Sequence, residues 1–393
     1  MNQSSVRSLA VLLAMLTAVA PLAIDMYLPA MQVMAVSLQT DIHRVELSIS
    51  TFLLGYAVGQ LIGGPMSDRL GRKPVIFIGL TLFALTSLIL SQVSSIDSLL
   101  LWRFIQAIGG GMAIVNSSAM IRDLFDGDEV ARVMSMVAMV MMSAPLLAPL
   151  LGAQVVEYVN WQSIFLLLAC YALLVVALIS WKLPESKAPV GARKGSLIKD
   201  YLSILRHRQA MGYVLAITFG FSGMFAFITA SAFVYLELFG ATAQQFPLLF
   251  GANIIVMMLM NRFNMWALNH YQASTILQFG LLLQLAAGLG LIATSQLGWG
   301  LYVVVGLNMI FVGSLGLIAA NATSSALNYF PHISGTATAI IGVSEFTIGA
   351  LVGWIWAMLH DGTLAPMAWV MTGCALIGLI AVKLLSRSPK AVL

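Results

Sequence analysis

The chain is poor in charge and nearly free of cysteine. Only 9% of its 393 residues are Asp, Glu, Lys or Arg, and 60% are hydrophobic. A soluble core of this size does not need so much apolar material, so most of it must face lipid or other membrane helices. Cys170 and Cys374 lie within apolar segments in opposite halves of the chain. Neither a disulfide nor a metal site is therefore expected.

The sequence also lacks the groupings that enzymes and ATP-driven pumps need. Its five histidines are scattered near the ends of apolar segments, whereas an enzyme brings His, Ser, Cys or metal ligands together. No Gly-x-x-x-x-Gly-Lys-Ser/Thr loop is present, which argues against ATP as the energy source. We expect no enzyme activity, no cofactor and no metal ion.

Long apolar runs dominate the sequence. A membrane-spanning helix needs roughly 20 mostly apolar residues, and the alternating pattern of an outer-membrane β-barrel is missing. The sequence therefore predicts an all-α membrane protein with twelve transmembrane helices. The expected segments lie near residues 8–36, 44–66, 74–93, 97–119, 131–155, 161–182, 211–237, 242–261, 274–294, 298–327, 333–358 and 364–385.

The basic residues predict the orientation in the membrane. With both termini inside, all but two of the 19 Lys and Arg residues fall on the cytoplasmic side; the exceptions are Arg44, outside, and Arg103, within a helix. Because cytoplasmic loops carry an excess of Lys and Arg, we expect a multi-pass protein of the bacterial inner membrane with both termini in the cytoplasm. The net charge of +4 then reflects topology and indicates no nucleic-acid partner.

One connection is longer than the others. Residues 183–210 are rich in Pro, Gly and basic side chains and separate six predicted helices from six more. We therefore predict an N-terminal six-helix bundle over 1–182, a cytoplasmic linker over 183–210 and a C-terminal six-helix bundle over 211–393.

A dense charge cluster occupies the predicted loop at residues 64–74, which read Gly-Pro-Met-Ser-Asp-Arg-Leu-Gly-Arg-Lys-Pro. The pattern Gly-x-x-x-Asp-Arg-x-Gly-Arg-Lys resembles the loop between the second and third helices of major facilitator superfamily transporters. A basic anchor is the simpler interpretation. Gly64 and Gly71 favour a moving gate, because they serve backbone geometry that an anchor does not need.

This loop has a predicted partner at the cytoplasmic end of the fourth helix. Asp68, Arg69, Arg72 and Asp123 can form an ion network that holds the inner helix ends together, and such networks can latch one conformation. Solvated charges without mutual contacts are the alternative.

Asp25 interrupts an uncharged run from Ser8 to Thr40. Charges within the bilayer are costly and usually functional. Pro29 removes the helical hydrogen bond to the Asp25 carbonyl and loosens the turn around the acid. Burial disfavours a charged carboxyl, so Asp25 can load and release a proton near neutral pH. The alternative is a structural carboxyl bonded to a neighbouring helix.

Two more charges lie within predicted helices. Arg103 shares a helix face with Gln106 and Gly110, and the run Gly109–Gly111 allows another helix to approach closely. An Arg103–Asp25 ion pair or water network is geometrically plausible, and it would keep Asp25 ionised. Arg103 is thus either coupled to Asp25 or purely structural. Glu345 lies on an inward face of helix eleven and is either a second proton site or structural.

Prolines mark the fifth predicted helix. Pro145 and Pro149, followed by Gly152, bend the helix and free backbone carbonyls. Such a helix suits a rocking protein, although a bent packing helix is also compatible with the pattern.

Taken together, these segments resemble the drug/proton antiporter branch of the major facilitator superfamily and, within it, the bicyclomycin/chloramphenicol-resistance (Bcr/CflA) group. The resemblance rests on residues 24–29, the 64–74 loop, residues 103–106, residues 144–152 and residues 224–235. It implies two pseudo-symmetric six-helix bundles, an acid in helix one that exchanges protons, an arginine in helix four that relays the coupling, and an antiporter motif in helix five. Asp25, Arg103 and Pro145 through Gly152 occupy those positions.

The resemblance implies proton-driven export of small, often amphipathic compounds such as drugs and antibiotics. Export of an endogenous metabolite or siderophore, and proton-coupled uptake, remain alternatives. A substrate pocket should be apolar and aromatic, and the expected lining is Tyr27, Phe225, Tyr235 and Phe346. The expected partners are a small-molecule substrate, protons and the lipid bilayer, and the chain is expected to act as a monomer.

Overall fold

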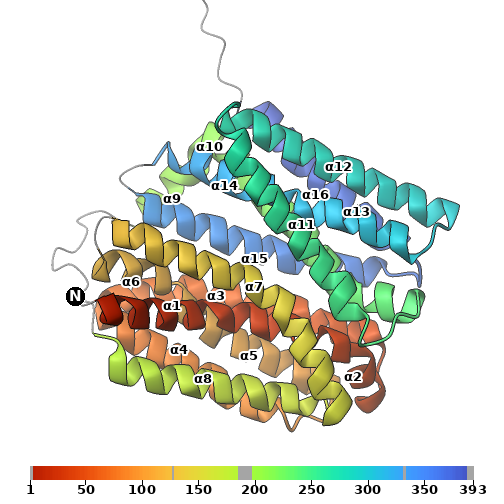
Figure 1. Ribbon diagram of the computed structural model, residues 1–393, viewed down its shortest axis with the longest axis horizontal. Coiled ribbons are helices and arrows are strands. Elements are labelled where there is room, and N and C mark those ends of the chain that lie inside the picture. The colour runs from red at the N-terminus through yellow and green to blue at the C-terminus, as the bar shows by residue number, and fades with distance from the viewer. Residues whose placement is uncertain (1–2, 126–127, 185–196, 331–332, 387–393) are drawn as a thin grey trace, which may run out of the picture. The chain divides into compact units, whose positions relative to one another are not determined.

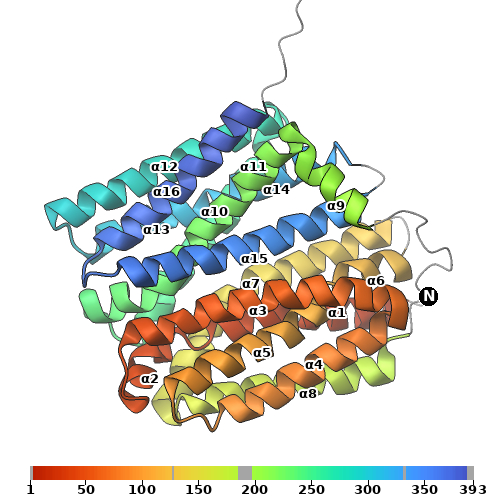
Figure 2. The same ribbon diagram turned by 180° about the vertical axis from the view of Figure 1, so that it is seen from behind.

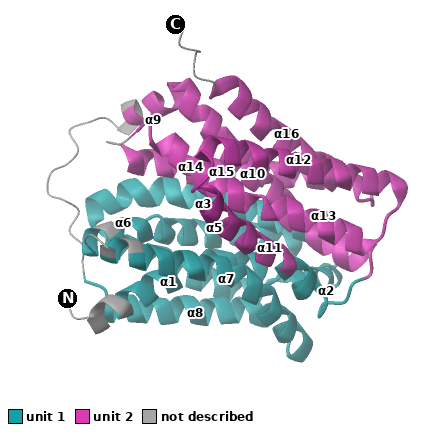
Figure 3. Ribbon diagram, turned by 45° about the horizontal axis from the view of Figure 1, so that its top comes forward, with its two compact units in different colours: residues 1–192, 241–251 teal, residues 193–240, 252–393 magenta. Residues whose placement is uncertain are grey.

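The computed structural model of the protein describes residues 3–125, 128–184, 197–330 and 333–386 (Figures 1 and 2). In these residues the regular elements are all helices, and 12 helical spans are long and apolar enough to cross a membrane. The predicted twelve-helix membrane fold is therefore confirmed. The chain forms two compact units, residues 1–192 with 241–251 (unit 1) and residues 193–240 with 252–393 (unit 2) (Figure 3).

Unit 1 holds the first six spans. Its elements are α1 (Gln3–Asp25), the 3-10 turn η1 (Leu28–Ala30), α2 (Met31–Ser37), α3 (Ile42–Leu70), α4 (Arg72–Leu90), α5 (Ile96–Ile114), α6 (Ser117–Leu124), α7 (Asp128–Tyr158) and α8 (Gln162–Lys182). Below, the end of unit 1 that contains the start of α3 is called the Asp41 end. The opposite end, where α3 turns into α4, is called the Gly71 end.

A ladder of glycines joins α3 to α5, which lie side by side in Figure 2. Gly55, Gly59 and Gly63 recur at every fourth residue of α3, so they share one face. A Cβ at any of them would collide with the backbone of Phe104, Ile108 or Met112 on α5. Small residues at this spacing let two membrane helices approach closely. The ladder fixes α5, and with it Arg103, against α3.

Unit 2 holds the remaining spans. Its elements are α9 (Leu197–Arg206), α10 (Arg208–Ala232), the π-helical segment η2 (Phe233–Leu238), α11 (Phe246–Ala267), α12 (Ala273–Leu297), α13 (Leu301–Gly313), α14 (Leu315–Leu327), α15 (Ser334–Leu359) and α16 (Ala365–Leu385). The short helix α9 lies inside the predicted linker, and residues 185–196 of that linker lie outside the described residues. The first residues of α11 group with unit 1.

Both units contain the same kinds of interruption. The turn η1 interrupts the first span of unit 1 between α1 and α2, and the first span of unit 2 ends in the π-helical η2. The fourth span of each is also interrupted, between α5 and α6 and between α13 and α14. Breaks inside membrane helices leave backbone groups to be bonded by side chains, and they commonly mark functional positions.

Candidate functional site

The first span breaks at the predicted acid. The last hydrogen bond of α1 runs from the Met26 amide to the Leu22 carbonyl, and the chain then passes through Tyr27 into η1. Pro29 has no backbone N–H, so it cannot donate a helical hydrogen bond to the Asp25 carbonyl, as the sequence predicts. Asp25 is 3% exposed, and among the described residues its Oδ1 atom has no hydrogen-bond partner. The break therefore leaves a buried carboxyl at the open end of a helix.

Arg103 binds this same open end. Its Nη2 donates to the Ala23 carbonyl at 3.0 Å, one of the last carbonyls of α1, which lack a partner within the helix. Its Nη1 donates to Gln106 Oε1 at 2.7 Å, and Gln106 Nε2 donates to Ser87 Oγ on α4 at 2.7 Å. A cation at a helix C-terminus is favourable because of the helix dipole. Arg103 thus caps the broken helix.

Aromatic rings enclose the guanidinium. Its central carbon lies 4.5 Å from the ring centre of Tyr27 and 4.3 Å from that of Phe52 on α3. The Tyr27 hydroxyl and Ser48 Oγ, also on α3, are 2.8 Å apart and hydrogen-bonded. Cation–π contacts stabilise a buried guanidinium by about 0.5–2 kcal/mol each. Two rings, the Ala23 carbonyl and the Gln106 amide therefore hold the arginine, and none of these described contacts involves a carboxylate.

Asp25 and Arg103 consequently meet in a different way from the predicted ion pair. Within the described part of the chain, no ion pair joins them. Arg103 reaches the backbone of the residue two positions before Asp25. Asp25 and the Arg103 guanidinium therefore lie at the same helix end, and the hydrogen bond from Arg103 to this end goes to its backbone.

Gly152 brings α7 against the same break. A Cβ at this position would overlap the Met26 carbonyl oxygen, directly after Asp25. Ala144 and Ala148 are buried on the same helix, and Pro145 and Pro149 lie within it without ending it. Gly152 of the predicted antiporter segment therefore packs against the residue that directly follows the acid.

We expect Arg103→Lys to reduce transport about ten-fold. Lysine keeps the charge, but it lacks the planar group that stacks on Tyr27 and Phe52 while donating to two acceptors. The loss of one charge-assisted hydrogen bond corresponds to about 1.5–3 kcal/mol. Initial efflux rates at equal protein amounts measure the effect. A lysine variant with the wild-type rate would show that charge alone suffices.

The predicted loop at 64–74 is mostly helical, which corrects that expectation. Residues 64–70 form the last turns of α3, with Pro65 inside the helix. Only Gly71 leaves helical geometry, at φ +95°, a conformation that favours glycine. α4 starts immediately afterwards, at Arg72.

Arg72 is the centre of the ion network at the Gly71 end. Its Nε donates to Asp123 Oδ2 at 3.1 Å. Its Nη1 donates to Ser67 Oγ at 3.1 Å and lies 3.7 Å from Asp68 Oδ1. Three of the four predicted network residues therefore come together, joining α3, α4 and α6.

The other predicted gate residues lie apart from these contacts. Arg69 is exposed and makes no ion pair with any described residue. A Cβ at Gly64 would meet open space, so close packing does not require glycine there. Lys73, which was not predicted, donates to the Ser180 and Leu183 carbonyls at the end of α8 at 3.0 and 2.8 Å.

We expect Arg72→Ala to reduce transport more than Arg69→Ala. Each substitution removes one positive charge from the same turn, but only Arg72 makes the contacts described above. Partly exposed pairs stabilise by about 0.2–1 kcal/mol each, and a total of one to two kcal/mol changes a conformational equilibrium by a factor of about 5–30. Equal rates in the two variants would mean that the network does not act as a latch.

In unit 2 the structure brings together two of the predicted aromatic residues. The rings of Phe225 on α10 and Phe346 on α15 are 5.6 Å apart, and a Cβ at Gly349 would press on Phe225. Glu345, next to Phe346, is partly buried. The second candidate acid therefore neighbours an aromatic pair.

Tyr235 lies in the π-helical segment η2 and is fully buried. Its hydroxyl accepts a hydrogen bond from Asn308 Nδ2 on α13 at 3.3 Å, and Asn253 on α11 also bonds it. Sequence reasoning missed both asparagines, although single amides in apolar runs are a usable signal. It also missed Ser48, Phe52 and Ser87, because nothing in their local sequence distinguishes them from packing residues.

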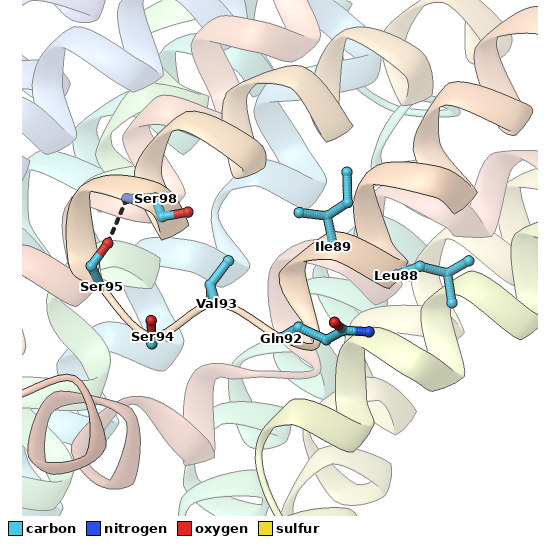
Figure 4. Close-up of a pocket in the computed structure, with 7 residues that line it drawn as sticks. All are labelled: Leu88, Ile89, Gln92, Val93, Ser94, Ser95 and Ser98. Atoms are coloured by element: carbon cyan, nitrogen blue, oxygen red, sulfur yellow. Dashed lines mark hydrogen bonds between the residues drawn. The ribbon is translucent and has the colours of Figure 1, made fainter.

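A shallow depression lies where α4 ends and α5 begins. It is lined by Leu88, Ile89, Gln92, Val93, Ser94, Ser95 and Ser98 (Figure 4). Ser95 Oγ accepts the Ser98 amide at 3.3 Å, which caps α5. The lining contains no charged side chain, no ring and no predicted site residue, so we assign no transported compound to it.

Comparisons with known proteins place this geometry in context. A sequence model of the Major Facilitator Superfamily matches residues 13–354. The chain is 34% identical over 385 residues to the "Bicyclomycin resistance protein homolog" of Haemophilus influenzae, with 97% of each chain covered. It is 31% identical over 346 residues to a "Chloramphenicol resistance protein" of Pseudomonas aeruginosa, covering 85% of this chain and 80% of that one.

The fold also matches solved structures. A crystal structure of a D-xylose-proton symporter superposes with a TM-score of 0.76 over 97% of both chains, at 16% sequence identity. At this identity the match shows a common fold and carries no information on the substrate.

Proposed function

The chain belongs to the Major Facilitator Superfamily, and on that premise we propose that it is a proton-coupled antiporter of the bacterial inner membrane. It exports small amphipathic compounds, drugs and antibiotics among them, by alternating access. The observation that carries the proposal is the buried Asp25 at the broken end of α1. Arg103 caps the same helix end by donating to the Ala23 carbonyl. The names of the relatives from Haemophilus influenzae and Pseudomonas aeruginosa support drugs as substrates.

The exchange runs through the end of α1. An ionised carboxyl is expensive to bury without a partner, and a protonated one is much less so. Asp25 therefore takes up a proton from the outer side when the substrate leaves. It releases that proton to the cytoplasm before the next substrate binds. Because Arg103 binds the Ala23 carbonyl, the charge state of Asp25 and the position of the helix end are coupled.

The remaining predicted residues have subordinate roles in this scheme. Within unit 2, the paired rings of Phe225 and Phe346 supply flat apolar surface for an amphipathic compound. Arg72, Asp68 and Asp123 latch the Gly71 end, which the basic residues assign to the cytoplasm together with both termini. Glu345 is a second proton carrier, and Glu345→Gln changes the pH dependence of transport under this proposal.

Everted membrane vesicles test the proposal. With labelled chloramphenicol outside and an acid lumen, vesicles that contain the protein accumulate the drug, and a protonophore abolishes the accumulation. Vesicles from a host without the gene are the control. Accumulation that persists without a proton gradient would contradict coupling, and drug moving in the same direction as the protons would indicate a symporter.

A further inference from the structure

Unit 1 contains a second buried carboxylate that the site above does not use. Glu46 lies just over one turn into α3, at the Asp41 end, and is 0% exposed. Its Oε2 lies 3.2 Å from Nδ1 of His43, whose side chain is 22% exposed. A buried acid thus has a titratable partner that reaches solvent.

Polar groups continue along the same face of α3. Residues 43, 46 and 50 are spaced by three and four positions, so they line up on one side of the helix. Ser50 is 5% exposed, and its Oγ has no hydrogen-bond partner among the described residues. An imidazole, a carboxyl and a hydroxyl therefore lead from the surface into the unit.

The same helix contacts the Asp25–Arg103 site. Ser48 bonds the Tyr27 hydroxyl, and Phe52 lies against the Arg103 guanidinium. With a rise of 1.5 Å per residue, Glu46 is about 3 Å from Ser48 and about 9 Å from Phe52 along the helix axis. The pair therefore lies on the same helix as Ser48 and Phe52, the two residues that contact the candidate coupling site, and the glycine ladder fixes this helix against α5.

The helices packed on α3 bring few other charged residues to the Asp41 end. The helices α2, α4 and α5 pack on α3. Of these, α2 has no charged residue, and α4 carries its charges, Arg72 and Lys73, at the Gly71 end. On α5, Asp97 pairs with Arg44 at 2.7 Å on the surface, and Arg103 lies deeper. Asp41 is exposed before the first turn of α3.

We propose that His43 and Glu46 form a further proton-binding site, separate from Asp25 and Glu345 and on the outer side of the membrane, which sets how transport depends on outer pH. The proposal rests on the proposed antiport function. The pair takes one proton from the outer solution onto the imidazole, next to the carboxylate, and its charge changes from −1 to 0. Two ionisable groups in contact share their protons and titrate as one unit.

Everted vesicles with the lumen set between pH 5 and pH 8.5 test this site, because the lumen corresponds to the outer side. In Glu46→Gln the imidazole loses its carboxylate, so the midpoint of the rate profile moves to lower pH by about one unit. His43→Gln removes the proton acceptor and also changes the profile. If Glu46→Gln does not fold, the change in the pH profile of His43→Gln still tests the proposal.

Arg44→Gln is the matched control, since it breaks an exposed ion pair at the same end and leaves the profile unchanged. A purely structural role would lower the rate at every pH without moving the midpoint, and that result overturns the inference. Profiles that superimpose on the wild type overturn it as well. Wild-type accumulation that ignores the proton gradient would instead refute the antiport function itself.

Discussion

Asp25→Asn should abolish proton-driven accumulation and leave the protein folded. Asparagine has nearly the same shape as aspartic acid, so it fits the break between α1 and η1. It cannot exchange a proton, and coupled transport should therefore fall to the level of vesicles without the protein. The measurement is drug accumulation in everted vesicles under an imposed pH gradient.

Two controls define this result. The melting temperature of the purified variant should be at least that of the wild type, because an amide has no charge to bury. Substrate exchange at equal pH on both sides should persist, since that movement needs no net proton transfer. An asparagine variant that still accumulates drug against a gradient would exclude Asp25 as the coupling acid.

Gly152→Ala should lower both stability and transport. The added methyl group would overlap the Met26 carbonyl oxygen, so α7 must move away from α1 at the residue after Asp25. Overpacking of this kind typically costs about 1–3 kcal/mol. Thermal unfolding in detergent, followed by tryptophan fluorescence, measures the loss of stability, and vesicle efflux measures the loss of transport.

Gly306→Ala is the matched control. Gly306 also lies inside a membrane helix, α13, but a Cβ there meets open space. Alanine favours a helix by about 1 kcal/mol over glycine, so this variant should be as stable as the wild type or slightly more so. Equal behaviour of the two alanine variants would mean that the Gly152 contact does not constrain α7.

The broad architecture was predictable because each membrane helix can be recognised from its own stretch of sequence. Each needs its own apolar run, and the count of twelve follows from the sequence. The break at Asp25 was predictable too, since Pro29 lacks the amide that would continue α1. The breaks at Asn116 and Ser314 were not predicted. There the side chains donate to the Met112 and Phe311 carbonyls. Such side-chain bonds compete with the hydrogen bonds of the helix backbone, and which of the two forms depends on the surrounding residues.

The buried charged residues of the candidate site, Asp25 and Arg103, were predictable, but their contacts were not. Gln106 shares a helix face with Arg103, so their hydrogen bond follows from spacing alone. The Ala23 carbonyl and the Phe52 ring come from other helices, and only packing brings them to the guanidinium. The bond from Arg72 to Asp123 on α6 belongs to the predicted ion network, whereas the sequence did not show that Arg69 makes no ion pair with the described residues.

The bond from Arg103 to Ala23 also shapes what genetics can find at this site. The acceptor is a main-chain oxygen, so no replacement of the residue 23 side chain deletes it. A double-mutant cycle between positions 23 and 103 should show almost no coupling, although the two residues touch. Second-site suppressors of Arg103 variants should instead arise among the side chains around the guanidinium, such as Gln106 and Phe52. Methods that infer contacts from paired substitutions will therefore overlook this connection.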